Sequence, residues 1–217
     1  MDSTSGAMNR LAWGCAVAAI ATFSYGIVVL AALHVLRPDY APASNFVSNY
    51  AVGPYGWVMS TFFISFSFGL ALLVTGLFAS GIRGMLGLAG FAALLVTAAG
   101  LIVTAIYPAD LPGAPYTRSG DIHELSFRVN VIGILVGVFC ISAALGADAL
   151  WRGQRRMLWT LAVVVAAALV IQFATLRKGL PYGIANRFFV VTVFAWMGFV
   201  ADRLRRTVPT QTGQAVR

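Results

Sequence analysis

Three separate polar segments of this sequence contain a serine, an aspartate and a histidine that could act together as nucleophile, orienting carboxylate and base. Serine is a weak nucleophile until a base takes its proton, and a carboxylate can hold an imidazole in the tautomer that does so. The candidate catalytic residues are Ser48, Asp110 and His123. The sequence has no Gly-x-Ser-x-Gly turn, which presents the serine in many hydrolases, so hydrolysis is one hypothesis among several.

The same three side chains also suit structural roles. Ser48 could cap a short interfacial helix, and His123 could donate a hydrogen bond to a loop carbonyl. Asp110 could cap a helix or pair with one of three arginines, which are Arg118, Arg128 and Arg187. The residues alone leave the catalytic and the structural interpretations open.

A metal site is a third hypothesis, and the spacing of the residues argues against it. His123 and Glu124 begin like the zinc motif H-E-x-x-H, but Phe127 stands where the second histidine is needed. The chain has only two histidines, His34 and His123, so a zinc ion would also need carboxylate ligands. We therefore predict neither a bound metal nor a cofactor.

The fourth hypothesis is a site for an anionic head group. Arginine can donate two parallel hydrogen bonds to a phosphate, and basic residues at a membrane surface attract anionic lipid. Five residues of the same polar segments are the predicted ligand-binding residues: Arg37, Asp39, Tyr50, Arg128 and Arg187.

Arg187 is unusual among these because apolar residues follow it directly. An arginine at the level of the membrane is unfavourable unless it is paired or close to water. We therefore expect a carboxylate partner, either Asp110 or Asp39. Gln172 lies within another apolar run, where we expect it to hydrogen-bond across to a neighbouring helix.

The composition shows what must position these residues. Of the 217 residues, 59% are hydrophobic and 10% are charged, whereas soluble domains have roughly 25% charged residues. A soluble fold of this length could not hide so much apolar surface, so lipid must surround most of the chain. The net charge of +8 comes from basic residues at the ends of apolar runs. No basic stripe with interleaved aromatic residues is present, and we predict no nucleic-acid binding.

Six apolar runs reach the length of about 20 residues that a helix needs to cross a bilayer. The predicted fold is an all-α integral membrane protein, a bundle of six transmembrane helices within residues 1–206, with a disordered polar tail at 207–217. The expected spans are Leu11–Leu33, Tyr55–Ala79, Met85–Ile106, Val129–Leu150, Met157–Thr175 and Ile184–Ala201.

The basic residues also favour one orientation. Nine of the fifteen Lys and Arg residues fall on the side of the two termini, which predicts cytoplasmic termini by the positive-inside tendency. The long connections His34 to Pro54 and Tyr107 to Arg128 would then share the outer face with the start of the last helix, near Asn186 and Arg187. Long loops in a compact bundle often carry function.

Small and hydroxylated residues inside the runs predict how the helices pack. Gly133 and Gly137 form a G-x-x-x-G pair, which allows two helices to approach closely, and we expect this contact within the bundle. The second run alternates hydroxyls with phenylalanines. We expect these hydroxyls to bond to their own backbone or to a neighbouring helix, and they are Ser60, Thr61, Ser65 and Ser67.

Three motifs at fixed places relative to the helices resemble the domain of unknown function 998 family of prokaryotic membrane proteins. They are RPDYAPASNFVSNYAVGPYGWVM from Arg37, YPAD from Tyr107 and DIH from Asp121. The resemblance covers about Leu11 to Arg203 and implies a multi-pass protein of the bacterial inner membrane. It also implies an acidic residue before the arginine of the last helix, where this chain has Asn186, which argues against an ion pair there.

The layout also resembles, more remotely, the eukaryotic six-helix family of autophagy modulators and GPI-lipid remodelling factors. That family similarly has a Ser-Asp motif after the first helix and a histidine before the fourth. The resemblance implies a lipid-related role on the exoplasmic side, as an analogy of layout alone.

The predicted function is therefore binding of a lipid or another amphiphile in a polar pocket on the outer face. Asp110, His123 and Arg187 would form its floor, with Ser48 and Tyr50 above. The alternatives are a serine-type lipid hydrolase, a structural or accessory subunit, and a small-molecule transporter, which would need a polar route through the bilayer or broken helices in paired halves. Membrane lipids are the expected partners, and a protein partner or a homo-oligomer stays open.

Overall fold

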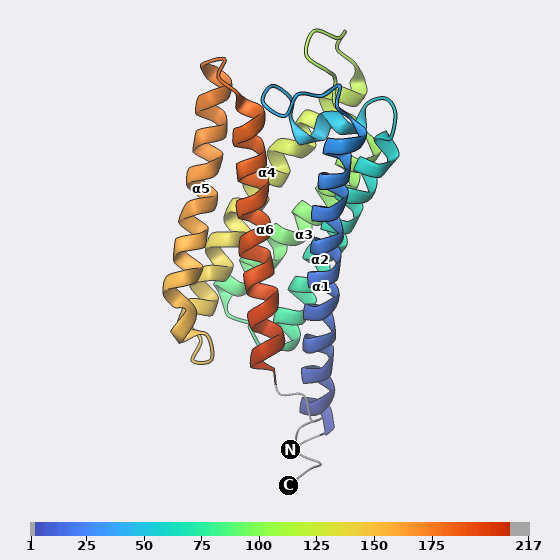
Figure 1. Ribbon diagram of the computed structural model, residues 1–217. Helices are drawn as coiled ribbons and strands as arrows, with labels where there is room; N and C mark the ends of the chain where they lie inside the picture. Colours follow the sequence, from blue (N-terminus) through green and yellow to red (C-terminus); the bar gives the residue numbers. More distant parts are fainter. Residues whose placement is uncertain (1–2, 209–217) are drawn as a thin grey trace.

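The structure, a computed structural model, describes residues 3–208 and contains six long helices within them (Figure 1). All six are long and apolar enough to cross a membrane, and the described residues form no strand. The all-α fold with six spans is confirmed. The helices are α1 (Ser3–Leu36), α2 (Gly56–Ala79), α3 (Met85–Ile106), α4 (Arg118–Ala147), α5 (Arg155–Arg177) and α6 (Tyr182–Thr207).

Several helix ends differ from the predicted spans. Helix α4 begins at Arg118 rather than Val129, and it ends at Ala147, so Leu150 lies in a turn before the short 3₁₀ helix η2 (Arg152–Gln154). Hydropathy detects the part of a helix that lipid surrounds and misses the polar turns beyond it. Thr207, predicted to begin the tail, ends α6 instead, and residues 209–217 of that tail lie outside the described residues.

The helices form a closed ring. Each helix packs against its neighbours in the chain, and the first and last helices, α1 and α6, pack against each other to complete the ring (Figure 1). We call the end of the bundle where α1 begins and α6 ends the terminal end. The opposite loop end carries the connections 37–55, 107–117 and 178–181. Which end faces the cytoplasm stays a prediction.

Aromatic rings fill the space between α1, α2 and α6. Phe23, Phe66 and Phe194 are all buried, with ring centroids 5.8 Å apart for Phe23–Phe194 and 4.8 Å apart for Phe66–Phe194. Such ring contacts add to the van der Waals packing that holds membrane helices together, because lipid provides little hydrophobic drive between them.

The predicted close approach of small residues is confirmed between α3 and α4. A side-chain carbon added at Gly133 would lie 2.9 Å from the Ala93 carbonyl oxygen, and one at Gly137 would lie 2.7 Å from Leu94 Cγ. Both distances are shorter than real contacts, so only glycine lets these backbones pack so closely.

The four hydroxyls of α2 that were predicted to bond to backbone or to a neighbouring helix are engaged as expected: Ser60, Thr61, Ser65 and Ser67. Ser60 and Ser67 donate across to α3, to the carbonyls of Ala105 (2.9 Å) and Ala98 (2.8 Å). The other two bond within α2 itself, Thr61 to Val58 at 2.7 Å and Ser65 to Phe62 at 2.9 Å. These bonds satisfy the hydroxyls within lipid.

Candidate functional site at the loop end

Arg187 lies in the second turn of α6, half-buried at the loop end, and it binds to groups from three parts of the chain. Within residues 3–208, the acceptors of its guanidinium are all neutral. They are His34 Nε2 (2.7 Å), the carbonyl oxygens of Pro42 (2.9 Å), Asn45 (2.7 Å) and Gly183 (3.0 Å), and the Tyr50 hydroxyl (3.2 Å). The expected ion pair of Arg187 with Asp110 or Asp39 is wrong, because backbone carbonyls and neutral side chains occupy the places of a carboxylate.

The contacts of His34 fix its protonation state. Its Nδ1 lies 2.7 Å from the Leu30 carbonyl oxygen, which can only accept, so Nδ1 carries the proton. Nε2 accepts from Arg187 Nε and must therefore be unprotonated. The imidazole of His34 is neutral in this arrangement, and no carboxylate in the described part of the chain pairs with Arg187.

A glycine allows α6 to come close enough for these bonds. The Gly183 N–H donates to the Ala43 carbonyl at 2.9 Å, so the start of α6 lies directly on the backbone of the first connection. A side-chain carbon at Gly183 would lie 2.6 Å from the Asn45 carbonyl oxygen, which no other residue could tolerate without moving the loop. Arg187, one turn further along α6, is thereby placed over the carbonyls of Pro42 and Asn45.

Tyr50 lies under Arg187 and ties it to the rest of the first connection. Only 1% of Tyr50 is exposed, and it belongs to the 3₁₀ helix η1 (Val47–Ala51). Its ring packs edge-on against the rings of His34 (5.2 Å between centroids) and Tyr40 (5.7 Å). The guanidinium carbon of Arg187 lies 5.7 Å from the centre of the same ring, within the range of a cation–π contact.

Asn186 anchors η1 to the helices below it. Its Oδ1 accepts from the Val47 N–H at 3.0 Å, the first backbone donor of η1, and its Nδ2 donates to Gln172 Oε1 at 3.3 Å. All three residues are buried. The prediction that Gln172 bonds to a neighbouring helix is confirmed. Where the family resemblance implied an acidic residue, Asn186 has an uncharged amide, whose oxygen accepts one hydrogen bond and whose nitrogen donates another.

Arg37 organises the other half of the first connection. It is only 5% exposed, and its Nη1 donates to the carbonyls of Val52 and Pro54, both at 2.7 Å. Its Nη2 pairs with Asp39 at 2.8 Å, and its guanidinium carbon lies 4.3 Å from the centre of the Tyr40 ring. The hydrogen bond from Arg37 holds the pKa of Asp39 below its ordinary value, and the same bond raises the pKa of Arg37 despite burial. We call His34, Arg37, Asp39, Tyr40, Tyr50 and Arg187 the arginine cluster.

Asp110, in the second connection, stabilises the start of α4. Its carboxylate accepts from the backbone N–H of Thr117 (2.8 Å) and from the Thr117 hydroxyl (2.7 Å). Thr117 is the N-cap of α4, and its hydroxyl accepts in turn from the Gly120 N–H at 3.1 Å. A carboxylate at a helix N-terminus is favoured by the helix dipole. Thr117 rather than Asp110 is the N-cap residue, so Asp110 supports the start of α4 by holding its cap and does not cap the helix itself.

His123 holds the second connection from within α4. Its ring is buried, its Nδ1 donates to the Tyr107 carbonyl at 2.8 Å, and the ring packs against Phe63 with 6.5 Å between centroids. The predicted bond from His123 to a loop carbonyl is thus confirmed. We call Asp110, Thr117 and His123, with the backbone they contact, the α4 cap.

Below the α4 cap, a buried chain of polar groups links α3 and α4. Asn130 donates to Thr104 (3.1 Å), Thr104 is hydrogen-bonded with Ser126 (2.9 Å), and Ser126 donates to the His123 carbonyl (2.8 Å). Asn130 Oδ1 is buried without a hydrogen-bond partner in the described part of the chain. These bonds belong to helix packing within the membrane and do not reach the arginine cluster.

The sequence pattern of a family described as "Protein of unknown function (DUF998)" matches residues 10–202. The chain belongs to this family. No curated protein and no solved structure matches the chain. The DUF998 assignment agrees with a six-helix membrane protein and leaves its activity to be inferred from the site itself.

In this DUF998 protein, the three predicted catalytic residues do not form a hydrogen-bonded set. Among residues 3–208, no hydrogen bond is present between any two of Ser48, Asp110 and His123. Ser48 lies half-buried on η1, whose N-cap is Phe46, so Ser48 does not cap that helix as predicted. The catalytic assignment stays a prediction, and two of its three side chains already have structural partners.

The predicted ligand-binding residues divide into two groups. Arg37, Asp39, Tyr50 and Arg187 meet in the arginine cluster. Arg128 instead pairs with Glu124 on the exposed side of α4, where its side chain is 67% exposed. No three His, Cys, Asp or Glu side chains gather into a metal site within residues 3–208.

Two contributors to the DUF998 site were missed by the sequence reasoning. His34 was considered only as a metal ligand, although a histidine at the end of an apolar run is well placed to meet a polar group at the interface. Gly183 gave a weaker signal, as a lone glycine two residues after a proline at the start of a helix. The carbonyls that bind Arg187 carry no signal in the sequence at all, because every residue has one.

Proposed function

We propose that this protein is a multi-pass membrane protein that binds the anionic head group of a membrane amphiphile at the arginine cluster. The observation that carries the proposal is the set of partners of Arg187. They are all neutral, so they fix the direction of the guanidinium without cancelling its charge. A half-buried cation without a counter-ion, placed where the helices leave the membrane, is favourable only if an anion or water approaches it.

The guanidinium retains the means to bind such an anion. Of its five N–H donors, Nε and both donors of Nη1 have protein acceptors, and one donor of Nη2 binds the Tyr50 hydroxyl. One Nη2 donor is left for a phosphate or carboxylate oxygen. Arg177 and Lys178 add positive charge at the same end, just before α6, which attracts anionic head groups.

The orientation favoured by the basic residues supports placing this site on the exoplasmic side. The resemblance to prokaryotic membrane proteins supports a location in the bacterial inner membrane. Asp110 and His123 are not part of the proposed ligand site, because their hydrogen bonds hold the second connection on α4.

The test compares the lipids that co-purify with three forms of the full chain in a mild detergent. Arg187→Gln keeps a polar side chain and removes the charge, and Arg128→Gln removes the charge of an exposed, paired arginine. Addition of phosphatidylglycerol, followed by native mass spectrometry, should show retained lipid on the wild type and on Arg128→Gln. Retention should fall about tenfold for Arg187→Gln, as expected for a hydrogen bond to a charged group.

Arg187→Lys separates lipid binding from folding. Lysine keeps the charge but cannot reach all the acceptors of Arg187, so it should loosen the first connection and still retain phosphatidylglycerol better than Arg187→Gln. Equal retention by the wild type and Arg187→Gln would overturn the proposal. Equal loss in the lysine and glutamine variants would also overturn it, because the arginine would then act through structure alone.

A further inference from the structure

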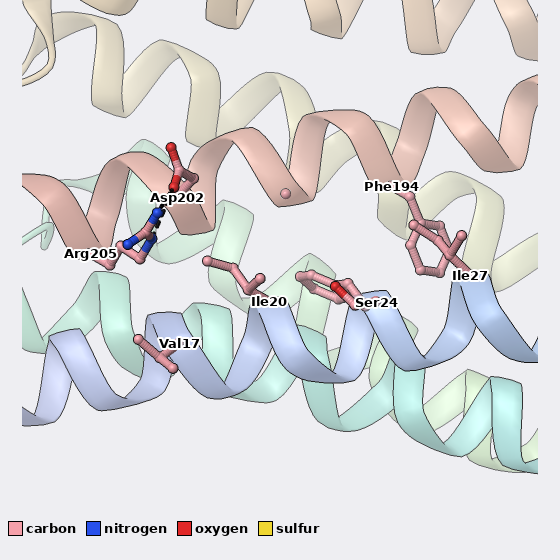
Figure 2. A pocket seen from close by; sticks show the side chains of 9 residues that line it. Val17, Ile20, Ser24, Ile27, Phe194, Asp202 and Arg205 are labelled. Atoms are coloured by element: carbon pink, nitrogen blue, oxygen red, sulfur yellow. Dashed lines mark hydrogen bonds and ion pairs between the residues drawn. The ribbon is translucent and has the colours of Figure 1, made fainter.

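A groove runs along the contact between α1 and α6, beside residues 17–27 of α1 and 194–205 of α6 (Figure 2). Its volume is about 350 Å³, within the range of small-molecule sites. Apolar side chains line most of it, including Phe23 and Ile27 from α1 and Phe194 from α6. Asp202 and Arg205 of α6 lie at the terminal end of the groove, as Figure 2 shows.

The groove exists because α6 has a glycine where a side chain would fill it. A side-chain carbon built at Gly198 would meet no atom within 4 Å. The floor beside it is rigid, since the buried rings of Phe23 and Phe194 pack edge to face with 5.8 Å between centroids. A glycine within a helix makes that helix less stable than an alanine would. The stability of α6 therefore does not explain why residue 198 is a glycine.

The length of the groove is close to half the thickness of the hydrocarbon core of a bilayer. On α1 it extends from Val17 to Ile27, which at 1.5 Å per residue is about 15 Å, half of the hydrocarbon thickness of roughly 30 Å. A transmembrane helix of a partner, or a second copy of this chain, would instead need a stripe through both leaflets. At the loop end the same contact between α1 and α6 is closed by Arg187 and His34.

At the terminal end of the groove, Asp202, Arg205 and Arg206 together carry one excess positive charge. Asp202 Oδ1 accepts from Arg205 at 2.6 Å, and Asp202 Oδ2 accepts from Arg206 at 2.7 Å. One carboxylate therefore serves two guanidiniums, whose side chains are 40% and 59% exposed. Their unused N–H donors can turn to a phosphate at the surface of that leaflet.

We propose that this groove is a second lipid site, which holds one acyl chain of an anionic phospholipid with its phosphate at Arg205 and Arg206. The chain would lie on the Phe23–Phe194 floor, beside Gly198. The phosphate end of this site lies at the end of the bundle opposite to the arginine cluster, and the site does not depend on the function proposed there. With cytoplasmic termini it faces the leaflet whose negative surface potential attracts arginine.

The test uses the full chain in vesicles that contain phosphatidylglycerol with a diazirine in the middle of one acyl chain. After illumination, mass spectrometry of peptides should locate the label on the α1 and α6 segments 17–27 and 194–198. Gly198→Leu places an apolar side chain in the groove, where its Cβ meets no atom within 4 Å, and labelling of these segments should fall about fivefold. Ala167→Leu adds the same side chain at an exposed position of α5 and should leave the labelling unchanged.

The head group is tested with the same diazirine on phosphatidylcholine and with the double variant Arg205→Gln/Arg206→Gln. At roughly fivefold per arginine near the surface, the double variant should reduce phosphatidylglycerol labelling to the phosphatidylcholine level. Labelling that is even over all lipid-facing helices, or that survives Gly198→Leu, would overturn the proposal. So would a change of oligomeric state in Gly198→Leu, which would make the groove a contact between chains. None of these results depends on Arg187.

Discussion

The two polar regions of the loop end stabilise the fold at very different ranges along the chain. In the α4 cap, Asp110 and Thr117 are 7 residues apart, and His123 reaches back 16 residues to Tyr107. In the arginine cluster, Arg187 and His34 are 153 residues apart. The cap therefore defines where one helix begins, whereas the cluster joins the first connection and the first helix to the last helix.

The two regions also differ in how charge relates to the helix that holds it. The carboxylate of Asp110 lies at the N-terminus of α4, where the helix dipole favours an anion. Arg187 lies near the N-terminal end of α6, where the dipole does not favour a cation. A charge with a favourable local setting needs no further role. Arg187 has no such favourable setting on its own helix. We therefore assign the ligand to the arginine cluster and not to the α4 cap.

The largest effect on stability is expected from Arg187→Gln, which removes the bonds that hold the first connection on α6. Loss of hydrogen bonds from a charged, half-buried donor should lower the free energy of unfolding by about 3 kcal/mol. Unfolding in detergent mixtures would measure this. Arg128→Gln is the matched control and should change the free energy by no more than about 0.5 kcal/mol. Equal effects of the two variants would remove the distinction between the cluster and an ordinary surface charge.

The next largest effect is expected from Gly183→Ala, which tests the close approach of α6 rather than the charge. The added methyl group would overlap the Asn45 carbonyl, so the free energy of unfolding should fall by about 2 kcal/mol. Gly198→Ala adds the same methyl group in open space on the same helix and should be neutral or stabilising. If the two substitutions had the same effect, helix propensity would explain the result and the close approach would not.

A smaller, local effect is expected from Asp110→Asn in the α4 cap. The amide loses the charge and one good acceptor for Thr117, so stability should fall by about 1 kcal/mol. In Asp110→Asn, hydrogen exchange should speed up in residues 111–120 and stay unchanged in residues 37–55. In Arg37→Gln, exchange should speed up in residues 37–55 and stay unchanged in residues 111–120. Faster exchange in both segments of either variant would show that the two regions are coupled.

The smallest effect is a pH dependence within the arginine cluster. Because Arg37 lowers the pKa of Asp39 in the folded state, this pair stabilises the fold above the ordinary carboxyl pKa of about 3.9. That contribution is lost as the pH falls through the lowered pKa of the folded state. The difference in unfolding midpoint between the wild type and Asp39→Asn should be constant from pH 7 to about 5 and vanish at lower pH. A difference independent of pH would rule out the ionised pair.

The sequence was sufficient for the features that depend on local pattern. The lengths of the apolar runs predicted all six helices. The side-chain types of Gln172, Asp110 and His123 predicted the kind of group that each one contacts: a neighbouring helix, the start of a helix and a loop carbonyl. The partners of Arg187 could not be predicted, because carbonyls of Pro42 and Asn45 take the place expected of a carboxylate. Which polar loops meet is equally hidden, since it depends on the order of the helices around the ring. Composition alone does not encode that order.

The closure of the ring by α1 and α6 has a consequence for biosynthesis. The ribosome makes α1 well before α6, so Arg187 meets His34 and the carbonyls of the first connection only after the five preceding helices have been made. Until then the bundle is open on one side towards the lipid, with the Phe23 and Phe66 rings uncovered by Phe194. A nascent chain stalled before α6 would be a five-helix intermediate, which membrane quality control could recognise by that open side.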